Sequence, residues 1–276
     1  MDNLIQMSKY FESGITKPYA FRKEQLKKLQ QAVKKYEQQL HQALYSDLKK
    51  SAEECWVTET GFLLSEVSNI LKHLKGWMEP EMVSTNLLNI PSKSFVMQEP
   101  LGVVLIISPW NYPFQLLMTP LAGAMAAGNC IVLKSSEFAP ATSAVMKQMI
   151  EETFDKNYIL FVEGDGAVVI PAMMNNFTFD HVFYTGSTTV GKIIYKMAAE
   201  RLVPVTLELC GKSPCIVEDD ANITVTAKRI AFAKFSNAGQ MCVAPDYVLV
   251  HHSKKQALIE AFKKLDAARN GIYQPA

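Results

Sequence analysis

The sequence predicts an α/β fold built on an open parallel sheet. From residue 102 onward, short continuous apolar runs alternate with helical patterns, which is typical of parallel strands covered by helices on both faces. Residues 1–80 show helical periodicity instead, and a further alternation of strands and helices begins after Thr206. Because strand–helix–strand crossovers are right-handed, we expect a Rossmann-like sheet behind N-terminal helices, followed by part of a second α/β domain.

The N-terminal helices are indicated by apolar residues three and four positions apart. In the first helix these residues are Leu26, Leu29, Val33, Tyr36 and Leu40. The lysines between them, Lys27, Lys28, Lys34 and Lys35, fit a solvated helix face better than a basic binding patch. A second helix fits residues 53–74. Residues 84–100 contain short extended runs broken by Pro91, which predict a hairpin or an arm that leaves the main body.

The next segment supplies the expected sheet. Strands fit 103–107, 130–133, 158–162 and 181–184, with a helix over 140–154. Asn111, Lys134 and Gly186 each follow the end of a strand. Since ligands of such sheets gather at the carboxyl ends of the strands, these three residues could meet at one edge.

A second set of elements follows Thr206. A strand fits 214–217, a helix fits 221–239 with Asp220 or Asn222 as its cap, a strand fits 245–250 and a helix fits 254–265. We found no internal repeat and no low-complexity segment in the sequence.

Composition limits the function classes. The chain has 276 residues, of which 49% are hydrophobic and 20% charged, and its net charge is +1. These values fit a soluble globular protein and give no argument for nucleic acid or an acidic membrane surface. The sequence shows neither a secretory signal nor an apolar run of membrane-spanning length.

The cysteines indicate a reducing compartment. Their odd number, five, without a secretion signal predicts free thiols and a cytoplasmic location. Cys210 and Cys215 have no histidine or cysteine partners at zinc-site spacing, so we expect no metal site. Cys130 lies in an apolar run and is expected to be a buried small hydrophobe.

Three residues suggest acyl chemistry. Cys242 follows Gly239, which permits a tight backbone approach before a nucleophilic thiol. Glu208 ends an expected strand, and its apolar neighbours predict partial burial, which would raise its basicity. Asn111 offers an amide donor. Taken singly, Glu208 could be a surface carboxylate and Asn111 a turn residue, but a nucleophile, a base and an amide donor are the parts that reaction at a carbonyl requires.

Five segments together resemble a known family. They are Pro109-Trp110-Asn111, Val132-Leu133-Lys134-Ser135-Ser136-Glu137, Phe183-Tyr184-Thr185-Gly186-Ser187, Leu207-Glu208-Leu209 and Gly239-Gln240-Met241-Cys242. In this order they resemble the aldehyde dehydrogenase superfamily, and most closely its class 3 or fatty-aldehyde branch. The similarity runs from about residue 10 to about residue 265.

The resemblance implies a dinucleotide site. The residues it assigns to the cofactor are Trp110, Lys134, Glu137, Gly186, Ser187, Val190 and Gly191. On spacing alone, Lys134 and Glu137 fit a surface ion pair. The segment 186–192 fits a structural turn at least as well as a phosphate site, since Ile193 replaces the magnesium-binding residue of a P-loop. By resemblance Glu137 contacts the adenosine ribose. That contact favours NAD, with NADP as an alternative in this branch.

The resemblance also implies a mechanism. The Cys242 thiolate attacks an aldehyde to give a thiohemiacetal, which Asn111 and the Cys242 amide stabilise. Hydride transfer to NAD(P) leaves a thioester, and Glu208 activates water to release the acid. Coenzyme A-acylating relatives lack this glutamate, so hydrolysis is favoured. The expected substrates are medium- or long-chain aliphatic or aromatic aldehydes, and the family form is expected to be a homodimer.

Two departures leave alternatives open. Cys210 stands where the family has glycine, close to the base and the nicotinamide region, and it could form a disulfide with Cys242. The family also continues well past residue 276, with a Glu-x-Phe-Gly-Pro segment that this sequence lacks, and residues 265–276 do not follow the family pattern. The rival functions are an incomplete fragment that binds cofactor or subunits without turnover, and a cofactor-independent thiol esterase.

These inferences give a domain layout. Residues 1–83 form the helical part of the cofactor domain and 84–100 a bridging hairpin for oligomerisation. Residues 101–208 form the Rossmann-like NAD(P)-binding domain, and 209–276 the first part of a catalytic domain.

Overall fold

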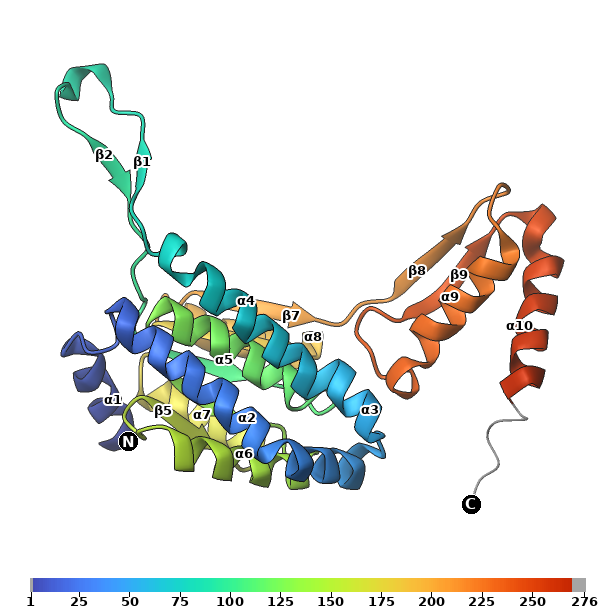
Figure 1. Cartoon of the computed structure of the whole chain (residues 1–276), viewed down its shortest axis with the longest axis horizontal. Helices are drawn as coiled ribbons and strands as arrows, with labels where there is room; N and C mark the ends of the chain where they lie inside the picture. The colour runs from blue at the N-terminus through green and yellow to red at the C-terminus, as the bar shows by residue number, and fades with distance from the viewer. Residues whose placement is uncertain (1, 270–276) are drawn as a thin grey trace. The chain divides into compact units, whose positions relative to one another are not determined.

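The computed structural model describes residues 2–269 of the chain (Figure 1). The chain divides into two compact units, Met1–Glu208 and Leu209–Ala276. The last seven residues, which belong to the segment that departs from the family pattern, lie outside the described part.

The first unit is built on a five-stranded sheet in the order β5-β4-β3-β6-β7. The strands are β3 (Val103–Ile107), β4 (Cys130–Lys134), β5 (Ile159–Val162), β6 (His181–Gly186) and β7 (Val205–Leu209). The pairs β3–β4, β3–β6 and β4–β5 are parallel. Every residue of β3 and β4 is buried, as expected for a central strand covered on both faces. The predicted α/β class and parallel sheet are therefore confirmed.

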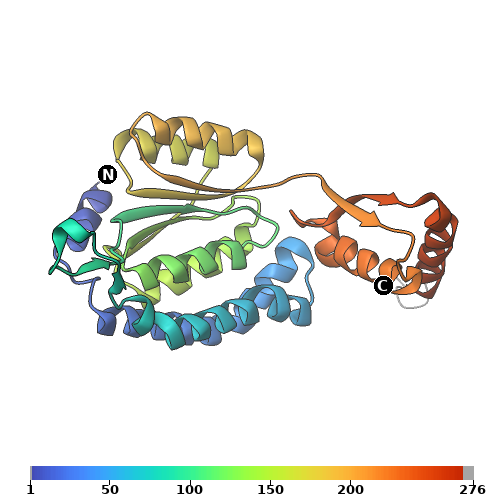
Figure 2. The same ribbon diagram turned by 90° about the horizontal axis from the view of Figure 1, so that it is seen from above.

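Helices cover both faces of this sheet (Figure 2). α5 (Gln115–Ala127) packs on β3 and β4, α6 (Pro140–Thr153) packs on β5, and α2 (Tyr19–Leu48) lies across α5 and α6. α7 (Gly166–Asn176) and α8 (Thr188–Ala199) pack together, and α8 also contacts β6. α1 (Asp2–Glu12) contacts β3 and β4.

The periodicity of α2 gives the burial that the sequence predicted. Its apolar positions, from Leu26 to Leu40, are buried, whereas Lys27, Lys34 and Lys35 are exposed. α2 ends at Lys49, whose left-handed backbone has φ of 58°. The lysines therefore form a solvated face of this helix.

The second predicted helix is not regular. The segment contains α3 (Ala52–Cys55), a π turn η1 (Trp56–Thr60) and α4 (Gly61–Trp77). The Gly61 N–H donates to the Trp56 carbonyl, five residues back. A π turn contains one extra residue, so the apolar pattern after the turn is shifted by one residue relative to the pattern before it. Apolar periodicity does not reveal such a turn, because α3 and α4 each keep helical spacing.

A short hairpin follows α4. β1 (Glu81–Val83) pairs antiparallel with β2 (Ser94–Val96), and a 3-10 turn η2 (Leu87–Asn89) lies between them. Its ladder starts at Glu81, three residues before the start expected from the sequence. The hairpin ribbon extends away from the sheet of its own unit (Figure 1). Its role in oligomerisation stays a prediction.

The second unit contains a two-stranded parallel sheet and two helices. β8 (Ser213–Val217) pairs with β9 (Pro245–Val250), and α9 (Ile223–Phe235) packs against α10 (Lys255–Arg269). A 3-10 turn η4 (His252–Lys254) precedes α10. Asn222 caps α9 by accepting from the Val225 N–H. The predicted helix over 221–239 is wrong at its end, because α9 stops at Phe235 and a 3-10 turn η3 (Ser236–Gly239) follows.

All five cysteines lie in the described part of the chain, and none forms a disulfide. Burial raises the pKa of the Cys130 thiol to about 12, in accord with its predicted packing role. Among residues 2–269, no helix combines the length and the apolar character needed to cross a bilayer.

Candidate active site

The carboxyl edge of the sheet gathers three predicted site segments. Register places Ile107, the last residue of β3, beside Lys134 on β4 and Tyr184 on β6. Asn111 lies on the loop that follows β3 and Gly186 ends β6, so the three predicted segments share one edge, as the sequence indicated. The chain order reverses direction between β3 and β6, and crevices at such switch points are the usual ligand sites of open α/β sheets.

The loop after β3 carries Trp110 and Asn111. Trp110 is exposed and Asn111 is half-buried. The Asn111 carbonyl accepts a hydrogen bond from the Lys50 ammonium at 3.0 Å. The loop leads into α5, so the position of Asn111 depends on contacts made by its own backbone rather than on a regular element.

Lys134 and Glu137 form an ion pair, but not the surface pair that their spacing suggested. Lys134 is only 1% exposed, and its ammonium lies 3.2 Å from the Glu137 carboxylate. The other Glu137 oxygen accepts from the Gly166 N–H at 2.9 Å. Partial burial opposes ionisation of Glu137, yet the Gly166 N–H and the Lys134 ammonium hold its pKa below the usual value. A partly exposed, ionised carboxylate therefore stands at the end of β4.

The turn after β6 is closed by local hydrogen bonds. Ser187 caps α8 by accepting from the Val190 N–H at 3.3 Å, and the Gly191 N–H donates to the Ser187 carbonyl at 2.9 Å. A Cβ added at Gly186 would lie 2.3 Å from the Tyr184 hydroxyl, so this position requires glycine. The turn presents an exposed helix N-terminus, a setting that favours phosphate.

The Glu208 side chain is more exposed than the sequence predicted. The side chain is exposed, although the apolar neighbours predicted partial burial. Successive side chains of a strand point to opposite faces, so Leu207 and Leu209 share a face that Glu208 does not. Leu207 is half-buried and Leu209 is itself exposed, so the two leucines do not shelter the carboxylate. Glu208 is the last residue of the first unit.

Cys242 belongs to the second unit and lies on an exposed loop before β9. The backbone ahead of it is left-handed at three consecutive residues, with φ of 50° at Asn237, 54° at Ala238 and 80° at Gly239. Side chains other than asparagine and glycine rarely adopt this region, so the segment is strained. The Asn237 amide donates to the Gln240 carbonyl at 3.3 Å, which helps to hold the loop that presents the thiol.

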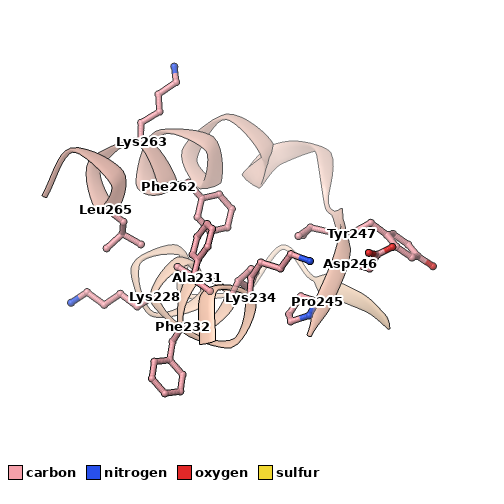
Figure 3. Close-up of a pocket in the computed structure, with 13 residues that line it drawn as sticks. Lys228, Ala231, Phe232, Lys234, Pro245, Asp246, Tyr247, Phe262, Lys263 and Leu265 are labelled. Atoms are coloured by element: carbon pink, nitrogen blue, oxygen red, sulfur yellow. The ribbon is translucent and has the colours of Figure 1, made fainter. Parts of the chain in front are cut away.

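The second unit also contains a cavity of about 740 Å³ within its own fold. Figure 3 shows Phe262 and Leu265 of α10 pointing toward α9, with Tyr247 of β9 at the rim. None of the predicted site residues lines this cavity. Its lining combines apolar side chains with three lysines and Asp246.

The comparisons with known proteins identify the family. A family model for the aldehyde dehydrogenase family matches residues 6–270. The chain belongs to the aldehyde dehydrogenase family. The 4,4'-diaponeurosporen-aldehyde dehydrogenase of Staphylococcus aureus is 51% identical over 92% of this chain and 55% of its own length. Aldehyde dehydrogenase family 3 member B1 of Rattus norvegicus is 42% identical over 95% of this chain and 56% of its length.

Solved aldehyde dehydrogenase structures agree with the fold. An S. aureus AldH in a substrate-bound state superposes with a TM-score of 0.92 at 48% identity, over 98% of this chain and 58% of that one. Betaine aldehyde dehydrogenase of S. aureus, in complex with NAD+ and with a mercaptoethanol-modified cysteine, gives a TM-score of 0.85 at 29% identity. That match covers 95% of this chain and 52% of the other. The chain thus spans about half the length of the aldehyde dehydrogenases that it matches.

Sequence reasoning missed two residues beside this aldehyde dehydrogenase loop. Lys50 and Glu59 form a buried ion pair that contacts the segment around Asn111. Burial raises the pKa of Glu59, although Lys50 and the Gln115 N–H oppose that shift. No local pattern predicts the burial of this pair, because charged residues in helices are normally solvated.

Proposed function

We propose that the protein takes part in the NAD(P)-dependent oxidation of an aldehyde to its carboxylic acid. The proposal rests chiefly on the family match over residues 6–270, together with the retention of Cys242, Glu208 and Asn111 in the segments that carry the resemblance. The exposed Cys242 loop supports it further, because a nucleophilic thiol must be reachable by its substrate.

The proposed chemistry uses three residues of this chain. The Cys242 sulfur attacks the aldehyde carbon and forms a C–S bond, which gives a thiohemiacetal. The Asn111 amide and the Cys242 N–H stabilise the resulting oxyanion; the loss of one such donor typically slows a reaction about 100- to 1,000-fold. Bound NAD(P)+ supplies the hydride acceptor. Glu208 then takes a proton from the water that attacks the Cys242 thioester, which frees the thiol and the acid.

The residues at the carboxyl edge fit the cofactor. Glu137 presents a carboxylate to ribose hydroxyls, and Lys134 holds that carboxylate in place. Ser187, Val190 and Gly191 form the start of α8, where the helix dipole favours a phosphate. The Trp110 ring lies on the loop beside this edge. A carboxylate repels the 2′-phosphate of NADP, so we infer a preference for NAD.

The substrate class is inferred from relatives. The class 3 resemblance supports medium- or long-chain aliphatic or aromatic aldehydes, and the 51% identical S. aureus enzyme is named for 4,4'-diaponeurosporen-aldehyde. We therefore include hexanal, hexadecanal, benzaldehyde and 4,4'-diaponeurosporen-aldehyde in the substrate series. A homodimer and a cytoplasmic location complete the proposal.

One assay tests this function. The purified protein is incubated with NAD or NADP and each aldehyde, and absorbance of the reduced cofactor is followed. We expect reduction that is lost in Cys242→Ala and retained in Cys215→Ala, which removes a thiol from a strand of the same unit. Reduction that persists in Cys242→Ala contradicts the assigned nucleophile.

Two rival functions give different results in the same assay. The second candidate function is binding of the cofactor or of partner subunits without turnover. That rival predicts NAD binding in a fluorescence titration and no reduction with any aldehyde. Cys242-dependent cleavage of 4-nitrophenyl acetate without cofactor supports a thiol esterase instead.

A further inference from the structure

A buried ion pair lies beneath the loop that carries Asn111. The Lys50 and Glu59 side chains are 2% and 0% exposed, and their charged groups are in direct contact. Desolvation of two charges offsets most of their attraction, so a buried pair is a weak source of stability and apolar residues can often replace it. Stability alone therefore does not explain why two charged residues are buried beneath this loop.

The pair makes three contacts with the segment that runs from the loop after β3 to the first residue of α5. The Lys50 ammonium donates to the Asn111 carbonyl at 3.0 Å and lies 4.0 Å from the centre of the Tyr112 ring. The second Glu59 oxygen accepts from the Gln115 N–H at 2.8 Å. An ammonium has three protons, and the carboxylate, the carbonyl and the ring face give it three partners.

The π turn explains how Glu59 reaches this position. Glu59 and Thr60 are both buried at the end of η1, and the chain turns into α4 at Gly61. A Cβ added at Gly61 would lie 2.5 Å from the Trp56 carbonyl oxygen, so the turn requires glycine there. Irregular π turns are frequent at functional sites, because they point a side chain away from the direction that a regular helix gives.

We propose that Lys50 and Glu59 are positioning residues for the Asn111 amide. They act through the backbone, which they hold at Asn111 and on its C-terminal side, and so keep the Asn111 side chain where an oxyanion forms. The inference rests on the proposed function for its catalytic consequence. Its structural part, that the pair holds the loop over 108–115, can be tested without any activity.

The first experiment is amide hydrogen exchange measured by mass spectrometry on the full chain. Lys50→Met should raise exchange at least several-fold in peptides that cover 108–118, with exchange in β4 and β6 unchanged. Lys35→Met is the matched control, because it removes an exposed ammonium that pairs with Glu152 on the surface. Unchanged exchange over 108–118 in Lys50→Met overturns the inference, whether or not the protein oxidises aldehydes.

The second experiment separates positioning from general damage. We expect Lys50→Met to lower kcat roughly 100-fold, the usual effect of misplacing a reacting group by about 1 Å, and to leave the dissociation constant of NAD within about twofold. Asn111→Ala should then cause little further loss in the Lys50→Met background, because both changes remove the same stabilisation. The positioning role is contradicted if the kcat losses of Lys50→Met and Asn111→Ala multiply in the double variant. It is also contradicted if Lys50→Met weakens NAD binding and leaves kcat unchanged.

A double variant keeps the test valid if Lys50→Met folds poorly. Lys50→Met with Glu59→Met removes both charges, so neither is left buried alone. This variant should fold, retain NAD binding and show the same low kcat and the same raised exchange over 108–118. Wild-type activity in a folded double variant overturns the proposal. If the wild type itself oxidises no aldehyde, the proposed function fails while the exchange experiment still decides whether the pair holds the loop.

Discussion

The N-terminus of α6 depends on a carboxylate from another helix. Ala139, the residue that precedes α6, gives no side-chain cap. Asp47 of α2 takes that role, since its two oxygens accept from the Ala141 N–H at 3.2 Å, the Thr142 N–H at 2.8 Å and the Thr142 hydroxyl at 2.8 Å. This contact joins the outer helix layer to the helix that follows the Glu137 turn.

The effect of Asp47→Ala can be worked from these contacts. Loss of a helix cap typically costs about 1 kcal/mol of unfolding free energy. Thr142 is fully buried, and a buried N–H without a partner costs about 1–3 kcal/mol more. We therefore expect Asp47→Ala to lower the unfolding free energy by about 2–4 kcal/mol, provided that no water reaches Thr142.

Urea unfolding followed by tryptophan fluorescence measures this loss. The signal reports the first unit alone, because that unit contains all three tryptophans, Trp56, Trp77 and Trp110. Asp165→Ala is the control. It removes one exposed capping bond, from the Ala167 N–H at 2.8 Å, and should cost only about 0.5–1 kcal/mol. Equal losses in the two variants would refute the reasoning that burial of the capped amides sets the magnitude.

Three further predictions follow from single positions. Gly186→Ala would place a Cβ 2.3 Å from the Tyr184 hydroxyl, so we expect about 1–3 kcal/mol lower stability by urea unfolding and weaker NAD binding by titration; unchanged values contradict this. Burial lowers the pKa of His181, so the unfolded state binds more protons and stability falls as the pH drops below about 6.5. His181→Gln should flatten that decline between pH 7 and 5, whereas His252→Gln, at an exposed site, should retain it. Cys210→Gly restores the residue usual in the resembled family, so NAD-linked turnover should rise or stay unchanged, and a clear loss would contradict the expectation that glycine suits this position.

The sheet was predictable because its signal is local. Continuous apolar runs such as Val103–Ile107 are typical of strands buried on both faces. Parallel pairing then brings the carboxyl ends of these strands together. The same logic correctly placed Asn111 and Gly186 at one edge. The burial of Cys130 was also predictable, because the residues around it in the sequence are apolar.

The sequence predictions that were wrong concern features that depend on contacts with distant residues or on unusual backbone angles. The helix expected over 221–239 ends early because Ser236 leaves the helical region, with ψ of 137°, and Asn237 and Ala238 then adopt positive φ. No residue type in this segment predicts that change of backbone. Lys134 is buried because the end of its strand is covered, and its charge is paired nearby with Glu137. Lys50 lies 61 residues from Asn111, so no local pattern connects the two.

The π turn before α4 also has a consequence for length variation among relatives. A π turn holds one residue more than a regular turn, so a homologue with one residue fewer between Cys55 and Gly61 should form a continuous α-helix there, with the positions of Cys55 and Leu63 seven residues apart and still on one face. A change of one residue in the length of this segment is therefore compatible with the fold. The acidic residue at the position of Glu59 and the basic residue at the position of Lys50 should be kept or lost together, because either charge alone would be buried without its partner.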